Sequence, residues 1–204
     1  MAGVTVNWWD AHPELMRAGG AFDQWTGGMH HPAKQYLASR VAHLGAHTIL
    51  DVGGGNGSLG DALRFGNWSG AYSVMDGAEV CVKRAGEAGH HAFRHDATDV
   101  PWPLTARPDV VVLRHVLEHL PKTADVAAVF GEALRHARRA VLVCAFHWTH
   151  DLTGGEWILD GLMHRATPLA LLRREAAQHG WPVSQEKQVT PQDYVLECWP
   201  ERLP

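Results

Sequence analysis

A cluster of glycines between an apolar segment and a helix-forming segment constrains this chain most. Residues 48–52 read Thr-Ile-Leu-Asp-Val, which is typical of a short buried strand, and residues 53–57 hold four glycines around Asn56. A helical pattern begins at Ser58 and continues to Phe65. Glycine lets the backbone approach a ligand closely, and free N–H groups at the start of the helix can bind it. This order of strand, tight turn and helix predicts an α/β fold with a nucleotide-like ligand.

The rest of the chain alternates apolar segments with helical ones. Strands are predicted at 71–76, 90–94, 108–113 and 140–146, and helices at 78–88, 125–137 and 169–179, the last capped by Thr167 with Pro168 at its first position. Such alternation predicts a parallel sheet with helices on both faces. The turn between 183–189 and 194–199 is too short for a parallel crossover, so these two strands are predicted to form an antiparallel hairpin at the sheet edge.

The length of 204 residues leaves room for one α/β domain and not for two with separate cores. Three parts of this single domain differ in character. Residues 1–45 are rich in aromatics and glycine and form a predicted helical cap, with one helix from Pro32 to about Leu44. Residues 46–147 form the predicted cofactor-binding core, and 148–204 form a substrate-side segment that ends in the last helix and the terminal hairpin.

Charge and cysteine content exclude several classes of partner. Lysine and arginine number 18 against 22 acidic residues, which gives a net charge of −4, and no block of like charge is present. This balance favours neither a nucleic acid nor an anionic membrane surface. Three scattered cysteines lack metal or redox spacing, and the sequence has neither a signal-peptide start nor an apolar stretch of about 18 residues. We expect a cytoplasmic monomer or homodimer.

Three acidic residues stand where predicted strands end, and two interpretations of the glycine loop compete. Asp76 is placed to bind ribose hydroxyls, and Asp96 to accept from an adenine amino group. Gly55, Gly57 and Gly60 match a dinucleotide fingerprint, which suggests NAD. Asp51 argues against this, because a carboxylate beside the loop repels pyrophosphate but suits an ammonium group. S-adenosylmethionine carries such a group, together with a sulfonium and no phosphate.

Four segments, taken in order, resemble the motifs of class I S-adenosylmethionine-dependent methyltransferases. They are 49–57 (Ile-Leu-Asp-Val-Gly-Gly-Gly-Asn-Gly), 72–76 (Tyr-Ser-Val-Met-Asp), 95–97 (His-Asp-Ala) and 108–121 (Pro-Asp-Val-Val-Val-Leu-Arg-His-Val-Leu-Glu-His-Leu-Pro). The resemblance covers roughly residues 46–200. It implies a Rossmann-like, doubly wound, seven-stranded sheet with the last strand antiparallel, S-adenosylmethionine as cofactor, and methyl transfer. The predicted cofactor-binding residues are Asp51, Gly53, Gly55, Gly57, Asp76, Asp96, Ala97 and Arg114.

Histidines after the fourth predicted strand offer chemistry. His115 and His119 frame a literal H-x-x-E-H, the pattern with which some peptidases bind zinc, but Pro121 truncates any helix there and no third ligand stands out. We therefore expect no metal. A neutral imidazole of His119, His115 or His147 is suited to take a proton from an acceptor hydroxyl. The alternative is that these rings bond to backbone carbonyls and hold the loop. His90 and His91, before the third strand, are expected to face solvent.

The sequence predicts a small-molecule acceptor, because the chain is compact, has no basic face and is rich in tryptophan on both sides of the core. Candidate acceptor-binding residues are Trp25, His31, Trp148 and Arg165, and Arg114 is a second candidate for holding an anionic group. We predict transfer of a methyl group from S-adenosylmethionine to an oxygen or nitrogen by in-line displacement. The alternatives are an NAD-dependent oxidoreductase and a cofactor-binding partner subunit without catalysis.

Overall fold

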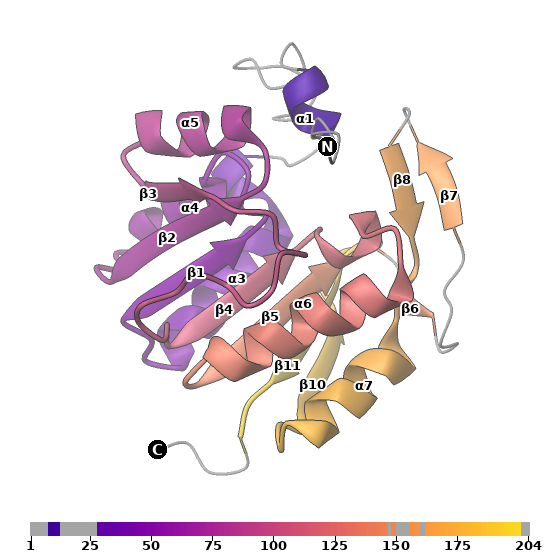
Figure 1. Cartoon of the computed structure of the whole chain (residues 1–204). Coiled ribbons are helices and arrows are strands. Elements are labelled where there is room, and N and C mark those ends of the chain that lie inside the picture. Colours follow the sequence, from indigo (N-terminus) through magenta and orange to yellow (C-terminus); the bar gives the residue numbers. More distant parts are fainter. Residues whose placement is uncertain (1–7, 13–27, 147, 150–155, 160–161, 201–204) are drawn as a thin grey trace.

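A seven-stranded sheet forms the centre of the molecule (Figure 1). The computed structural model describes residues 8–12, 28–146, 148–149, 156–159 and 162–200. The strands are β1 (Thr48–Val52), β2 (Ala71–Asp76), β3 (His91–Arg94), β4 (Val110–Arg114), β5 (Ala140–Ala145), β10 (Val183–Gln188) and β11 (Tyr194–Cys198). Their order is β10-β11-β5-β4-β1-β2-β3.

The five strands of the core are parallel, and β11 runs against β5. The β10–β11 pair is antiparallel, so β10 points the same way as the core strands. The predicted doubly wound sheet with an antiparallel last strand is therefore confirmed. Its order reverses beside β1, where β2 and β3 lie on one side and β4 and β5 on the other. In such sheets ligands bind at the carboxyl ends of the strands beside this reversal.

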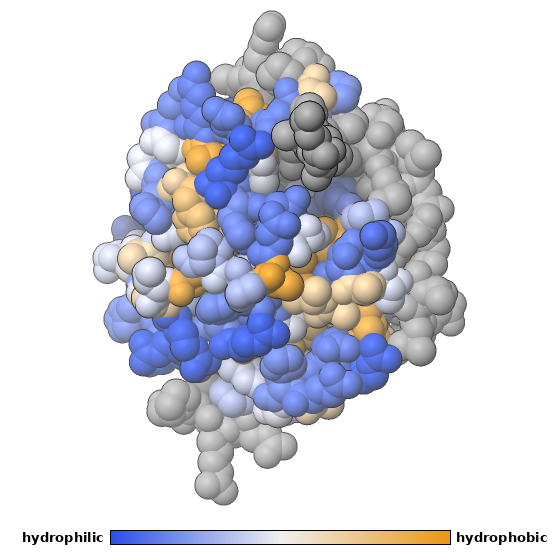
Figure 2. All heavy atoms as spheres, viewed as in Figure 1, coloured by the Kyte–Doolittle hydropathy of each residue, from blue (hydrophilic) through white to orange (hydrophobic). Residues whose placement is uncertain are grey.

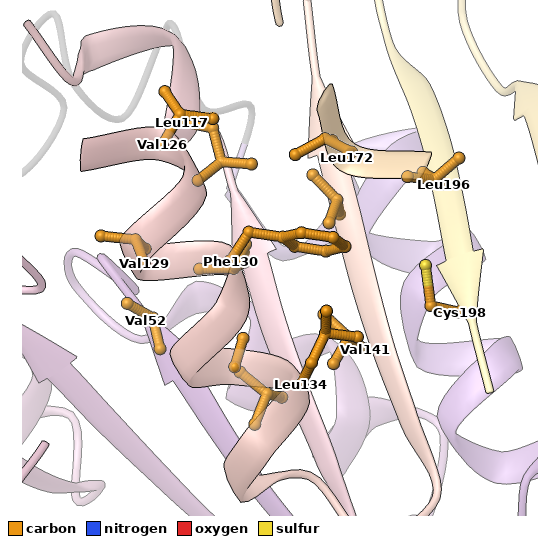
Figure 3. Close-up of a cluster of buried hydrophobic side chains, with 14 of the residues drawn as sticks. Val52, Leu117, Val126, Val129, Phe130, Leu134, Val141, Leu172, Leu196 and Cys198 are labelled. Atoms are coloured by element: carbon orange, nitrogen blue, oxygen red, sulfur yellow. The ribbon is translucent and has the colours of Figure 1, made fainter. Parts of the chain in front are cut away.

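Helices cover both faces of the sheet because each central strand is apolar on both sides. One face packs on α3 (Pro32–His43), α4 (Ser58–Phe65) and α5 (Glu79–Glu87). The other face packs on α6 (Thr123–His136) and α7 (Leu169–Gln178). Figure 3 shows Phe130 of α6 at the centre of this second layer, between side chains of the sheet and Leu172 of α7. Phe130 is fully buried.

Short elements lie at the carboxyl side of the sheet. They are α1 (Trp8–Ala11), η2 (Gly28–His30), η3 (Leu117–His119), β6 (Trp148–Thr149), β7 (Glu156–Leu159), β8 (Leu162–Arg165) and β9 (Thr167–Pro168). Parallel pairing joins β6 to β9, and antiparallel pairing joins β7 to β8, which contacts η3. The sequence predicted none of these four strands.

Two local predictions are wrong. Thr167 does not cap α7: Pro168 holds the cap position, and Thr167 pairs with Trp148 in β9 with its hydroxyl buried. His90 does not face solvent, because its side chain is fully buried while His91 is exposed. In both cases a contact with a distant segment overrides the local pattern.

The described surface is largely polar. Figure 2 shows hydrophilic residues over most of the visible described face, with hydrophobic ones scattered between them. Within the described residues, no helix combines the length and the hydropathy that crossing a membrane requires. All three cysteines are buried, and none forms a disulfide.

Candidate active site

The glycine loop after β1 needs glycine for two separate reasons. Gly53, Gly55 and Gly57 have φ of 62°, 59° and 79°, in the left-handed region that residues with a Cβ rarely adopt. Space is also short, since a Cβ on Gly53 would lie 2.5 Å from Cγ2 of Val116, in the segment after β4. The loop is therefore held close to the end of β4. It leads directly into α4, for which Gly57 is the N-cap.

Asp76, at the carboxyl end of β2, holds the loop in place. Its Oδ2 accepts from the N–H of Gly55 (3.0 Å) and its Oδ1 from the N–H of Ala78 (2.9 Å). Burial raises the pKa of Asp76 to about 6, although these two N–H groups lower it. The Cys81 thiol also hydrogen-bonds to this carboxylate and lowers its pKa. The two oxygens have four lone pairs between them, so one acceptor site stays open for a ligand hydroxyl.

Asp51 lies behind the same loop and is buried. Its Oδ2 accepts from the hydroxyl of Tyr72 (2.5 Å), whereas its Oδ1 is buried without a hydrogen-bond partner in the described part of the chain. Burial raises the pKa of Asp51 to about 6, against the lowering effects of the Tyr72 hydrogen bond and the Arg114 charge. A buried carboxylate oxygen without a partner is costly unless a ligand meets it. An ammonium group fits this need.

The predicted adenine-side residues follow β3. Asp96 is exposed, and its Oδ1 accepts from the N–H (2.9 Å) and the hydroxyl (2.8 Å) of Thr98. Ala97 is half-buried, and its carbonyl accepts from the indole N–H of Trp102 (2.9 Å). These bonds hold the turn at the edge of the sheet next to Asp76.

Two buried residues that support the loop were not predicted from the sequence. The ring of His90 fills the space beside Gly57, and its Nε2 lies 3.0 Å from Oδ1 of Asp61. Lys34 of α3 is fully buried, and its Nζ donates to Oγ of Ser58 (2.6 Å) and to the carbonyl of Gly28 (2.8 Å). One signal pointed to Lys34, because it shares the helical stripe of Leu37, Ala38 and Val41. We find no such local signal for His90.

His115, directly after β4, lies between two buried carboxylates. Its Nδ1 is 2.7 Å from Oε1 of Glu118, and its Nε2 is 3.0 Å from Oδ1 of Asp193, in the turn between β10 and β11. The ring stacks on Phe146 with centroids 3.9 Å apart, and the backbone has a left-handed φ of 54°. Burial raises the pKa of Asp193, but hydrogen bonds from His115 and Thr190 bring it down to about 2. His115 thus ties the end of β4 to the β10–β11 turn.

The H-x-x-E-H pattern does not form a peptidase-like zinc site. Such a site needs both histidines on one face of an α-helix, whereas η3 is a 3-10 helix of three residues that starts after His115. The Glu118 carboxylate contacts His115 itself. His119 is half-buried at the end of η3, and β8 packs beside it.

Comparison with known proteins identifies the family. A family profile described as "Methyltransferase domain" matches residues 29–187. The chain belongs to this methyltransferase family. The predicted class I S-adenosylmethionine-dependent methyltransferase is thereby confirmed, and the oxidoreductase interpretation of Gly55, Gly57 and Gly60 is set aside. A search of curated proteins found no match for the chain.

Solved structures confirm the fold of this methyltransferase. The magnesium protoporphyrin IX methyltransferase ChlM from Synechocystis PCC 6803, with bound S-adenosylmethionine, matches with a TM-score of 0.68 at 16% identity over 95% of this chain and 94% of that one. DesVI from Streptomyces venezuelae matches with a TM-score of 0.68 at 14% identity, over 88% and 96%. NcsB1, an O-methyltransferase from neocarzinostatin biosynthesis, matches with a TM-score of 0.67 at 21% identity, over 94% and 60%.

Some of the residues predicted to lie on the acceptor side of this methyltransferase are among the described residues, and others are not. Trp25 and His147 lie outside the described residues, and only the backbones of Trp148 and Arg165 are described, in β6 and β8. His31 is the N-cap of α3: its Nδ1 accepts from the N–H of Ala33, and its Nε2 is 3.9 Å from Oδ2 of Asp193. Burial lowers the pKa of His31, although Asp193 raises it. His31 and His115 therefore meet at one carboxylate.

Proposed function

We propose that this methyltransferase transfers a methyl group from S-adenosylmethionine to an oxygen or nitrogen of a small-molecule acceptor. The observation that carries the proposal is the pairing of a left-handed glycine loop with two buried carboxylates, Asp51 and Asp76, at the carboxyl ends of β1 and β2. A site with two buried acids beside its loop disfavours a pyrophosphate and favours a ligand that carries cationic groups.

Each cofactor-side residue has a distinct role in this proposal. Asp76 receives the two ribose hydroxyls, one on the lone pair that stays open beside Gly55 and Ala78 and one in place of the weak hydrogen bond from the Cys81 thiol. Oδ1 of Asp51 faces the amino group. Asp96 and Ala97 bind the adenine edge, and the glycines let the backbone approach the ligand. The bound cofactor supplies a methyl group already activated by its positively charged sulfur, so the protein has mainly to align the acceptor with it.

On the acceptor side, we assign the proton acceptor to His119. Both ring nitrogens of His115 already face carboxylates, so we assign His115 to positioning the loop after β4. His147 is the second candidate for the base. We retain Trp25, His31, Trp148 and Arg165 as candidates for binding the acceptor, and Arg114 as a positive charge near Asp51.

Several observations support a small acceptor. The net charge of −4 disfavours nucleic acid. NcsB1, which shares the fold, was solved with 1,4-dihydroxy-2-naphthoic acid, a small aromatic hydroxy acid. The cytoplasmic location and the monomeric or homodimeric state stay predictions.

Mass spectrometry on a panel of hydroxyl, amine and carboxyl metabolites, incubated with the protein and S-adenosylmethionine, tests the proposal. We expect one compound class to gain the mass of one methylene group, in step with release of S-adenosylhomocysteine. Transfer to protein or nucleic acid in place of every small molecule would contradict it. Cofactor binding without turnover on any acceptor would instead favour the non-catalytic partner subunit.

A further inference from the structure

Three side chains of different chemistry converge at the carboxyl ends of β4 and β5. A ring nitrogen of His115, Sγ of Cys144 and a carboxylate oxygen of Asp193 all lie within 4.8 Å of one another. Cys144 is fully buried in β5, and the His115 and Asp193 side chains are 12% and 2% exposed. Imidazole nitrogen, thiolate and carboxylate oxygen are together the ligand types that zinc prefers.

Two of the three pairs of atoms have nearly the spacing that a shared tetrahedral ion requires. Zinc bonds of about 2.0–2.3 Å place neighbouring nitrogen and oxygen ligands about 3.4 Å apart and sulfur and oxygen ligands about 3.6 Å apart. In the structure Nε2 of His115 is 3.0 Å from Oδ1 of Asp193, and Sγ of Cys144 is 3.9 Å from the same oxygen. Shifts of a few tenths of an ångström would give these two pairs the spacing of zinc ligands.

Glu118 provides the second, independent observation. Histidines that bind a metal usually donate their other ring N–H to a carboxylate, which fixes the ring and its tautomer. Nδ1 of His115 is 2.7 Å from Oε1 of the fully buried Glu118, so Nε2 is the nitrogen turned to Cys144 and Asp193. The left-handed backbone of His115 holds the ring in this position.

We propose that His115, Cys144 and Asp193 form a binding site for a zinc-type divalent cation, oriented by Glu118. The proposal goes beyond methyl transfer and does not depend on it, and it differs from the metal-free site that the sequence predicted. The ion replaces the thiol proton of Cys144 and the Nε2 proton of His115, so the net charge of the buried cluster is unchanged. Three protein ligands leave a fourth position for water or another exogenous ligand.

The competing explanation is an ion-pair cluster without a metal. A doubly protonated His115 then satisfies Glu118 and Asp193, and the Cys144 thiol donates a weak hydrogen bond to Oδ1 of Asp193. The two explanations differ in what the thiol does. A metal site requires the thiolate of Cys144 as a ligand, whereas the ion-pair cluster keeps the protonated thiol as a donor to Asp193.

The experiment uses the full chain without an affinity tag, stripped with a chelator and titrated with Zn²⁺ or Co²⁺. We expect one Zn²⁺ per chain by calorimetry and, with Co²⁺, a thiolate-to-cobalt charge-transfer band in the near ultraviolet. Cys144→Ala should abolish the band. Cys198→Ala is the matched control, because Cys198 is an equally buried thiol on the neighbouring strand β11 outside the cluster. Glu118→Gln should weaken Zn²⁺ binding about 10–100-fold.

Three results would overturn the proposal. They are the absence of stoichiometric Zn²⁺ binding by the folded parent, a cobalt complex without a charge-transfer band, and equal loss of binding in the Cys144 and Cys198 variants. Absence of the band from the parent's spectrum overturns the proposal even if Cys144→Ala fails to fold.

Discussion

Asp76 combines a structural and a ligand-binding role in one side chain. Asp76→Ala removes the acceptor for Gly55 and Ala78 together with the proposed ribose contact. We expect affinity for S-adenosylhomocysteine to fall by about 2–4 kcal/mol, the range for lost charge-assisted hydrogen bonds, as measured by calorimetry. Asp96→Ala, at an exposed position, should cost less. An unchanged dissociation constant in Asp76→Ala would move the ribose site elsewhere.

The two histidines after β4 should separate catalysis from stability. His119→Ala should lower kcat by about 10²–10⁴ with little change in S-adenosylhomocysteine binding, if His119 is the base. His115→Ala leaves Glu118 and Asp193 without their partner and should lower the free energy of unfolding by about 3–5 kcal/mol. Steady-state kinetics and denaturant unfolding measure the two effects. Parental turnover in His119→Ala would pass the role of base to His147.

The conformation of the glycine loop depends on the segments that contact it on either side, at the end of β2 and after β4. Gly55→Val places a branched side chain at φ 59° and should abolish cofactor binding by calorimetry, with a smaller effect on stability. Gly86→Ala is the matched control, since a Cβ there meets nothing within 4 Å inside α5. Binding by Gly55→Val at the parental level would show that the loop is not the cofactor site.

The strands of the terminal hairpin could be predicted from the sequence, but the contact that its turn makes with a distant segment could not. Its strands and their antiparallel pairing were predicted from two apolar segments and a short turn, and β10 and β11 confirm them. The same pattern did not predict the contact of Asp193 with His115, which lies 78 positions earlier in the chain. Thr190, whose hydroxyl donates to Asp193, explains the local turn but not its distant partner.

Across the whole molecule, features set by residues close together in the sequence were predicted, whereas features set by contacts between distant residues were not. Strands β1 to β5 and the core helices were predicted because apolar periodicity and glycine signals are local. The burial of His90 and Lys34 depends on side chains more than 20 residues away. Of these two residues, only the burial of Lys34 could have been inferred from the sequence, because Lys34 is the charged residue on an otherwise apolar helical stripe.

The pH dependence of folding is also a property of the whole molecule. Because the pKa of Asp51 is about 6 in the folded state against an ordinary 3.8, the folded chain holds this proton to higher pH than the unfolded chain does. The free energy of unfolding of the cofactor-free parent, relative to Asp51→Asn, should therefore fall by about 2 kcal/mol between pH 4 and pH 6. Denaturant unfolding of both proteins across this range measures the difference. Parallel curves would mean that Asp51 is already ionised at pH 4.

Calorimetric titration of the full chain with S-adenosylhomocysteine and, in parallel, NADH tests the central claim most directly. The claim is that the loop of Gly53, Gly55 and Gly57, with Asp51 and Asp76, holds an S-adenosyl cofactor. It predicts one S-adenosylhomocysteine per chain, no saturable binding of NADH, and loss of the thioether's binding in Gly55→Val. Saturable binding of NADH without binding of S-adenosylhomocysteine would contradict it.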